Sequence, residues 1–285
     1  LEVDREPIAE SRAHPGRVLP THELEAQPAE HRAGRRHDLQ LEARSVAGVA
    51  AGWDVLVLAG LHVGDRPSRE DGEVVVGAGA HGVTVHPRLD ERHVRRADVP
   101  ALWAHLQSEH PTIEFNVECE DDPSLIDMVL ELRPHQCTLV PVTPGEVTSD
   151  HGWNPVAQAD RLRPVIERLR DAGIRTSCFA DAEPASMAAF AALGVDRVEL
   201  YTGPYAWAWG TEEQPAQRAL VHESAAAAVA AGLDVNAGHD LDRHNLEGLR
   251  GCPGLEEVSI GHASICRALD VGTTQAVKEL LAALA

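Results

Sequence analysis

The chain has 285 residues, a formal net charge of −20 and 44% hydrophobic residues. A chain of this length can bury a sizeable core, in one α/β barrel or in two smaller domains. The negative charge argues against nucleic acid or an anionic membrane as a general partner, because a polyanion would be repelled over most of the surface. Anionic small substrates would therefore need local basic pockets.

The five cysteines are spread widely, without the C-x-x-C pair that would suggest zinc. We expect them to be reduced and mostly buried. No apolar run reaches the roughly twenty residues that a transmembrane helix needs. The amino terminus, acidic and then rich in histidine and arginine, does not resemble a signal peptide. These features predict a cytoplasmic protein with no membrane partner.

The first part of the chain has no sustained period of two or 3.6 residues. We therefore expect residues 1–52 to form an atypical, disordered or loosely packed extension and residues 53–285 to form the folded domain. The segment WDVLVLA at 53–59 is a candidate first strand. A loop at 64–68 and a first helix at 69–76 follow it.

From residue 82 onward, short apolar segments alternate with longer segments of helical period, which is typical of repeated βα units. The expected strands cover residues 83–86, 113–118, 137–141, 175–180, 197–202, 234–237 and 257–261. The expected helices cover residues 99–107, 123–132, 155–172, 184–193, 212–231, 241–249 and 273–283. Seven units and one early strand predict a (β/α)8 TIM barrel. The alternative is a doubly wound open sheet, but no G-x-G-x-x-G follows the first strand.

Polar residues stand at or just beyond the ends of these strands, and in a barrel such ends face one pocket. They are His86, Arg88, Glu118, Thr148, Glu199, His239, Gly261 and His262. His86 could be a general base or only a cap that bonds a neighbouring carbonyl. Glu118 and Glu199 would each need a partner or a raised pKa if buried, and a buried ion pair is the structural alternative for Glu199.

A Gly-His pair recurs at the ends of the last two expected strands, at 238–239 and 261–262. Phosphate sites in barrels commonly lie there, because glycine lets backbone N–H groups approach a phosphate closely. Arg88 and His93 could hold a second anion, although the neighbouring arginines are also consistent with a solvated basic edge.

Six segments together resemble pyridoxine 5'-phosphate synthase. They are TVHPRLDERH at 84–93, FNVE at 115–118, EVT at 146–148, ELYTG at 199–203, NAGH at 236–239 and IGHA at 260–263. The resemblance runs in unbroken order from about residue 64 to the carboxyl terminus, and the His-x-Arg-x-Asp-x-Arg-His run is specific.

The resemblance implies a barrel enzyme, usually a homo-oligomer, that condenses 1-deoxy-D-xylulose 5-phosphate with 3-amino-2-oxopropyl phosphate. The products are pyridoxine 5'-phosphate, inorganic phosphate and water, and the reaction uses no redox cofactor. No metal-ligand cluster is evident in the sequence.

Four residues match catalytic positions of the family: His86 as general base, Glu118 as second acid-base group, His239 as proton donor and Glu199 as stabiliser of a charged intermediate. Six match substrate-binding positions: Arg88, His93 and Thr148 for the deoxyxylulose phosphate, and Asp240, Gly261 and His262 for the aminoketone phosphate. Because reactive imines must be shielded from water, residues 144–154 are the candidate lid.

The first strand departs from the family. The family's Asn-x-Asp run and Leu-Arg-Asn-x-Arg-Gly loop contact both substrates, whereas this chain has WDVLVLAGLH at 53–62 and only GDRPS at 64–68 resembles the loop. The departure predicts weak or absent synthase activity. A displaced reading frame over the first part of the coding sequence would explain it, and an intact frame on resequencing would contradict that explanation.

Two other functions remain open on the sequence. A metal-dependent sugar-phosphate isomerase or epimerase could use His86, Glu118, Glu199 and His239 as ligands of a divalent ion. A degenerate barrel could instead bind phosphorylated sugars without turning them over.

Overall fold

The computed structural model describes residues 54–57, 69–91, 94–143, 146 and 148–285. All of these residues belong to one compact unit, Ala50–Ala285. The expected extension at 1–52 and the substrate-binding candidate His93 lie outside the described residues, so both stay predictions.

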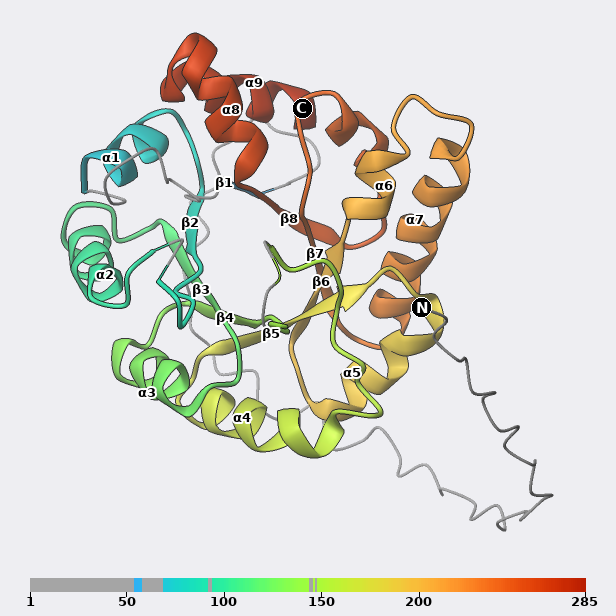
Figure 1. The fold of residues 1–285 in the computed structure, drawn as a ribbon, viewed down its shortest axis with the longest axis horizontal. Helices are drawn as coiled ribbons and strands as arrows, with labels where there is room; N and C mark the ends of the chain where they lie inside the picture. The colour runs from blue at the N-terminus through green and yellow to red at the C-terminus, as the bar shows by residue number, and fades with distance from the viewer. Residues whose placement is uncertain (1–53, 58–68, 92–93, 144–145, 147) are drawn as a thin grey trace, which may run out of the picture. The chain divides into compact units, whose positions relative to one another are not determined.

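Parallel strands form a closed barrel and follow one another around it in chain order (Figure 1). The strands are β1 (Asp54–Val57), β2 (Gly82–Val85), β3 (Glu114–Cys119), β4 (Gln136–Leu139), β5 (Arg175–Asp181), β6 (Arg197–Tyr201), β7 (Asp234–Gly238) and β8 (Leu255–Ile260). Pairing of β8 with β1 closes the ring. The predicted (β/α)8 barrel is confirmed, and the segment expected to be the first strand contains β1.

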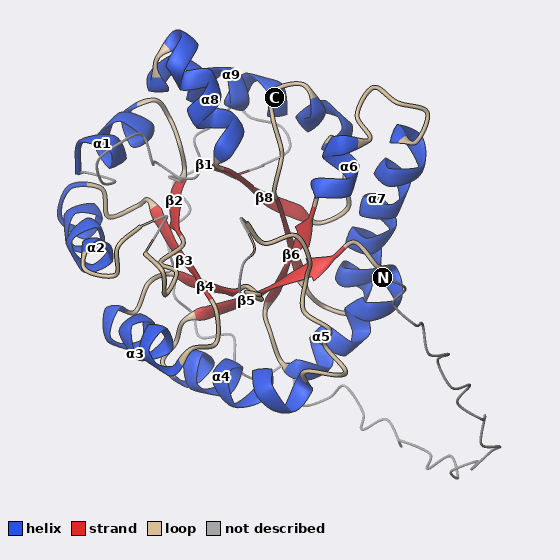
Figure 2. Cartoon of the chain, in the orientation of Figure 1, coloured by secondary structure: helices blue, strands red, loops and turns tan. Residues whose placement is uncertain are grey.

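Helices form a layer around the outside of the barrel (Figure 2). The α-helices are α1 (Arg69–Gly77), α2 (Asp98–Glu109), α3 (Pro123–Leu132), α4 (Ala159–Asp171), α5 (Met187–Leu193), α6 (Gly203–Trp207), α7 (Gln214–Ala230), α8 (His262–Val271) and α9 (Thr273–Leu284). The described residues also form the short 3-10 helices η2 (Pro184–Ser186) and η3 (Asn245–Leu249). None of the helices in the described part of the chain is long and apolar enough to cross a membrane.

The expected helix at 241–249 is the largest difference, because only η3 forms there. The carboxylate of Asp242 accepts hydrogen bonds from the backbone N–H groups of His244 and Asn245, at 2.8 and 2.9 Å. Such a side-chain turn offers the backbone an alternative to helical bonding. Two helices, α6 and α8, were not expected, and both begin directly beyond a strand end, at Gly203 and His262.

The hydrophobic core lies between the strands and the helices, whereas the barrel interior is polar. Val83, Val85 and Phe115 belong to the buried apolar cluster. Residues between them point to the other face, as alternation along a strand requires. There the amide of Asn116 donates to Thr84 and accepts from Thr138, each at 3.2 Å. These hydrogen bonds join β2, β3 and β4 inside the barrel, next to the strand ends that carry the site residues.

The cysteines are free, as expected. Cys119, Cys137, Cys178 and Cys252 are buried, but Cys266 on α8 is exposed. Burial raises the pKa of Cys178 and of Cys252 to about 12, so both are held as inert thiols at neutral pH.

Candidate active site

His86 and Glu118 form a pair at the ends of two neighbouring strands. Nδ1 of His86 lies 3.3 Å from Oε2 of Glu118, and the side chains are 12% and 15% exposed. The register explains the meeting: Thr84 on β2 lies opposite Asn116 on β3, so residues two positions further along share the inward face. An imidazole beside a carboxyl group at a partly open mouth can exchange a proton with a bound molecule.

The pKa of the Glu118 carboxyl group is raised to about 7, chiefly by burial and in addition by the negative charge of Glu257. Glu257 lies on β8 and is only 4% exposed, and burial together with the charge of Glu114 raises its own pKa to about 8. A carboxyl group that titrates near 7 can both accept and donate a proton at neutral pH, as general acid-base catalysis requires.

Glu199 lies on β6 and is 2% exposed. Burial raises its pKa well above the usual range, and the nearby charge of Glu118 raises it further. Its Oε2 atom has no hydrogen-bond partner among the described residues. The ion pair considered for Glu199 is not found among the described residues, and burial favours the protonated form of this inward-facing carboxyl group.

His239 follows β7 in a left-handed conformation, with a φ of 87°, and Asp240 after it has a φ of 57°. The hydroxyl group of Thr202 holds this turn, because it donates to the carbonyl oxygens of Gly238 and His239 at 2.6 and 2.7 Å. Such backbone strain in residues other than glycine costs about 1–3 kcal/mol and clusters at functional sites.

The ring nitrogens of His239 both face polar groups. Nε2 lies 3.0 Å from the hydroxyl oxygen of Thr148, and Nδ1 lies 3.2 Å from Oδ2 of Asp240. The same Asp240 oxygen accepts a hydrogen bond from the indole N–H of Trp207 at 2.9 Å. The structure therefore brings His239, Asp240 and Thr148 together across two loops.

Aromatic side chains form a wall beside His239 that the sequence analysis did not single out. The ring of Tyr201 lies 5.2 Å from that of His239 at 81°, and the ring of Phe179 lies 6.3 Å away. Trp207 packs edge-on against Tyr201 at 6.3 Å. Period-two alternation along β6 offered a signal for Tyr201, because it shares the inward face with Glu199.

Three further predicted residues are Arg88, Gly261 and His262. Arg88 is 3% exposed, and its Nε lies 4.0 Å from Oδ1 of Asp90. Gly261 is the residue before α8, and His262 is the exposed first residue of that helix. Among the described residues, no hydrogen bond or ion pair joins His262 to the rest of the predicted site.

The candidate lid is anchored at its far end. The indole N–H of Trp153 donates to the carbonyl oxygen of Leu139 at 2.9 Å, and the backbone N–H of Gly152 donates to Asp181 at 2.8 Å. Within the proposed segment 144–154, residues 144, 145 and 147 lie outside the described residues. Movement of this segment stays a prediction, and its hinge would have to precede Gly152.

The geometry does not favour the metal-dependent alternative. In the described residues, no three of His86, Glu118, Glu199 and His239 bring ligand atoms within 4.8 Å of one another. Two other groups do so: Glu73, His105 and His110, and Glu146, Asp150 and His151.

A profile of the family described as "Pyridoxal phosphate biosynthesis protein PdxJ" matches residues 66–285. The chain belongs to the PdxJ family. The matched range contains all ten predicted site residues, whereas β1 lies before it.

Curated members of the PdxJ family are closely similar to this chain. A protein of Albidiferax ferrireducens named "Pyridoxine 5'-phosphate synthase" is 50% identical over 214 residues, which cover 73% of this chain and 84% of the relative. A protein of Mesorhizobium japonicum with the same name is 46% identical over 215 residues, covering 74% of this chain and 87% of the relative.

Solved structures show the same fold at low sequence identity. The tryptophan synthase α-subunit of Pyrococcus furiosus superposes with a TM-score of 0.56 at 13% identity, over 81% of this chain and 98% of the neighbour. A Thermus thermophilus phosphoribosyl anthranilate isomerase gives a TM-score of 0.52 at 14% identity, over 81% and 97%. At such identities the likeness concerns the barrel alone.

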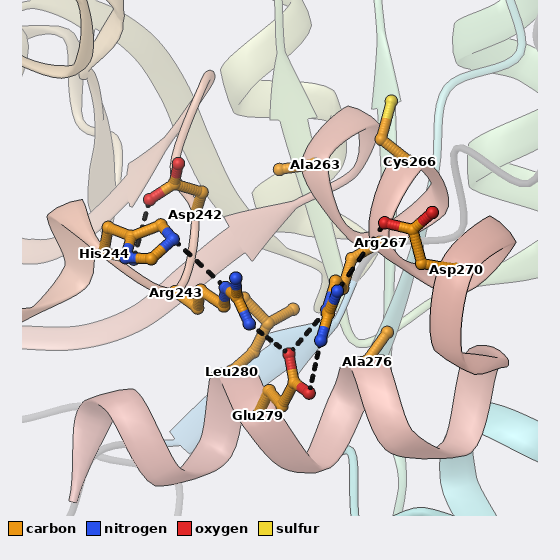
Figure 3. Close-up of a pocket in the computed structure, with 10 residues that line it drawn as sticks. All are labelled: Asp242, Arg243, His244, Ala263, Cys266, Arg267, Asp270, Ala276, Glu279 and Leu280. Atoms are coloured by element: carbon orange, nitrogen blue, oxygen red, sulfur yellow. Dashed lines mark hydrogen bonds and ion pairs between the residues drawn. The ribbon is translucent and has the colours of Figure 1, made fainter.

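A separate hollow lies between the loop 242–244 that precedes η3 and the helices α8 and α9 (Figure 3). Glu279 occupies one side of it and binds both arginines that line the hollow, Arg243 at 3.0 Å and Arg267 at 2.8 Å. Hydrogen bonds from Arg267 lower the pKa of Glu279 to about 2. Since both guanidinium groups are already paired with this carboxylate, we do not assign the hollow to a substrate phosphate.

Proposed function

We propose that the chain is a pyridoxine 5'-phosphate synthase, which condenses 1-deoxy-D-xylulose 5-phosphate with 3-amino-2-oxopropyl phosphate. Membership of the PdxJ family and the names of the relatives support the activity. The observation that carries the proposal for this chain is the His86–Glu118 pair, with the pKa of Glu118 raised to about 7. Imine formation, enolisation, two dehydrations and ring closure all need proton transfers near neutral pH.

Each proposed catalytic role has a physical basis. His86 acts as general base and Glu118 exchanges protons with it across 3.3 Å. His239 donates a proton, and its ring is oriented by Thr148 and Asp240. Burial raises the pKa of Glu199 well above its usual range, and a cationic intermediate beside it would favour the carboxylate, whose negative charge would stabilise that intermediate.

The proposed binding roles follow the strand ends. Arg88, His93 and Thr148 would hold the deoxyxylulose phosphate, and Asp240, Gly261 and His262 would hold the aminoketone phosphate. We also propose, on the resemblance alone, a cytoplasmic homo-oligomer with neither a redox cofactor nor a metal in the reaction.

A substrate incubation tests the activity. Purified protein is incubated with both phosphorylated substrates, and pyridoxine 5'-phosphate is followed by its absorbance and confirmed by mass spectrometry. We expect product only when both substrates are present, at a low rate because of the divergent first strand, and we expect this turnover to survive a chelator. Loss of turnover in the chelator would support the metal-dependent alternative. Calorimetric binding of the deoxyxylulose phosphate without product would support the non-catalytic barrel or the failure expected from the divergent first strand.

Glu257→Gln should shift the pH dependence of the reaction. The charge of Glu257 contributes to the raised pKa of Glu118, so its removal should lower that pKa below about 7. We expect the limb of the kcat profile that reports Glu118 to move to lower pH, with maximal turnover reduced less than in Glu118→Gln. A pH profile of kcat over about 5 to 9, the range in which these groups titrate, measures the shift. An unmoved limb would contradict the coupling.

Gly238→Ala should disturb Glu199. An added Cβ at Gly238 would overlap Oε1 of Glu199, so the carboxyl group would have to move. We expect a lower melting temperature, corresponding to about 1–3 kcal/mol, and a kcat reduced by up to about 10²-fold because the group is misplaced. Steady-state kinetics and calorimetry measure both effects.

Gly77→Ala is the matched control, because a Cβ there meets nothing within 4 Å. It should leave kcat unchanged. Equal loss of kcat in the two variants would show that the effect of Gly238→Ala is not due to Glu199.

A further inference from the structure

Two histidines and one glutamate converge on the outer layer of the barrel, away from the strand ends that carry the proposed chemistry. Glu73 lies on α1, His105 lies on α2, and His110 is the residue that follows α2. Nε2 of His105 lies 2.8 Å from Oε1 of Glu73, and Nε2 of His110 lies 3.0 Å from the same oxygen. All three ligand atoms lie within 4.8 Å of one another.

The end of α2 produces this convergence. Side chains five residues apart on a regular helix point about 140° away from each other, given about 3.6 residues per turn. His110 leaves the helix with a φ of −135° and a ψ of 59°, while its N–H still bonds the carbonyl oxygen of Leu106 at 2.8 Å. This turn brings the two imidazole rings to a centroid distance of 6.1 Å at 78°.

The two ring nitrogens are enclosed without a good hydrogen bond. Nε2 of His105 and Nε2 of His110 are both buried, and neither makes a well-aligned hydrogen bond among the described residues, although Glu73 is close. The side chains of His105 and His110 are 14% and 25% exposed, whereas that of Glu73 is 45% exposed. Buried imidazole nitrogens thus face a carboxylate with one side open to solvent.

We propose that Glu73, His105 and His110 form a binding site for a divalent transition-metal ion, with zinc as the best match. Two imidazoles and a carboxylate are a donor set that zinc accepts, and water completes the tetrahedron. Bonds of about 2.0–2.1 Å would set neighbouring ligand atoms about 3.3 Å apart, so the present separations need only small side-chain shifts.

The ion would brace the barrel where its sheet is least extensively paired. Among the described residues, β1 and β2 share the single register pair Leu56 and Gly82, whereas β2 and β3 pair from Gly82 with Glu114 to Val85 with Val117. α1 connects β1 to β2, and α2 connects β2 to β3. A metal bridge from α1 to α2 would therefore tie the β1–β2 connection to the well-paired part of the barrel.

Metal titration of the full chain tests the site. Protein freed of metal with a chelator is titrated with zinc chloride in a calorimeter, and its melting temperature is measured with and without zinc. We expect one zinc per chain and a higher melting temperature with zinc, because an ion that binds only the folded state stabilises it. His105→Ala and His110→Ala should each weaken binding by at least about tenfold.

His151→Ala is the matched control, because His151 belongs to the other group of converging donors, with Glu146 and Asp150. It should bind zinc as the parent chain does. Retention of binding in His105→Ala and His110→Ala, or loss in His151→Ala, would overturn the assignment, as would absence of saturable binding.

Cobalt supplies a measurement that does not depend on variant folding. Cobalt-loaded parent protein should show the intense visible absorption of a four-coordinate ion, and zinc should displace it. A weak spectrum typical of six oxygen ligands would overturn the site. Synthase turnover should be the same with and without zinc, so failure of the proposed function would leave this test intact.

Discussion

Glu118→Gln is expected to lower kcat by about 10²–10⁴-fold, the usual contribution of a general acid or base. The amide keeps the shape of the carboxyl group but cannot take up or release a proton at neutral pH. His86 should keep its position. The group that lies 3.3 Å from its Nδ1 atom would, however, no longer be a carboxyl group. Steady-state kinetics with both phosphorylated substrates measure the loss.

The same substitution should stabilise the folded chain at alkaline pH. Burial raises the pKa of Glu118 to about 7 in the folded state, whereas an unfolded chain has the ordinary value of about 4.5. Between these values the folded state binds the extra proton, so the free energy of unfolding falls as the pH rises and the loss is complete above about 7. Removing the group should recover up to about 3 kcal/mol at pH values above about 8.

Urea unfolding at two pH values checks the sign. At a pH near or below about 4.5 the carboxyl group is protonated in both states, so the gain from Glu118→Gln should disappear. Glu131→Gln is a control because Glu131 is exposed on α3, and it should lack the pH-dependent gain. A variant of Glu118 that loses activity and is also less stable at alkaline pH would contradict the account.

The barrel and the set of strand-end residues could be predicted from local sequence. The pairing of Glu118 with His86 follows from alternation along two neighbouring strands, since both positions lie on the inward face just past the Thr84–Asn116 register pair. α3 was predicted at its observed bounds because Pro123 occupies its first position and the carboxylate of Asp122 accepts the N–H of Ser124.

Features that depend on distant parts of the chain could not be predicted in this way. The influence of Glu257 on Glu118 joins β8 to β3 across the barrel, and no local pattern reports it. The shortened helix at 245–249 depends on a side-chain turn at Asp242 that competes with helical bonding. Likewise, the meeting of His105 with His110 needs the non-helical backbone at the end of α2.

His239→Asn is the second substitution for which we expect a large effect, with kcat lowered by about 10²–10⁴-fold. Asparagine is chosen because the φ of 87° at this position strains most residues, and asparagine tolerates the left-handed region better than alanine does. The backbone turn held by Thr202 should therefore survive, while the imidazole that faces Thr148 and Asp240 is lost. Steady-state kinetics measure the effect of losing the imidazole, and the melting temperature shows whether the backbone turn is preserved.

His262→Ala provides the comparison within the same rim of the barrel. His262 is exposed at the start of α8 and is proposed to bind a phosphate, so its loss should mainly raise the KM for the aminoketone phosphate. His239→Asn should instead lower kcat with a smaller change in KM, because a proton donor acts in the transition state. If His239→Asn changed only KM, His239 would be a binding residue, and proton donation would have to come from the Glu118–His86 pair or from Glu199, whose pKa burial raises.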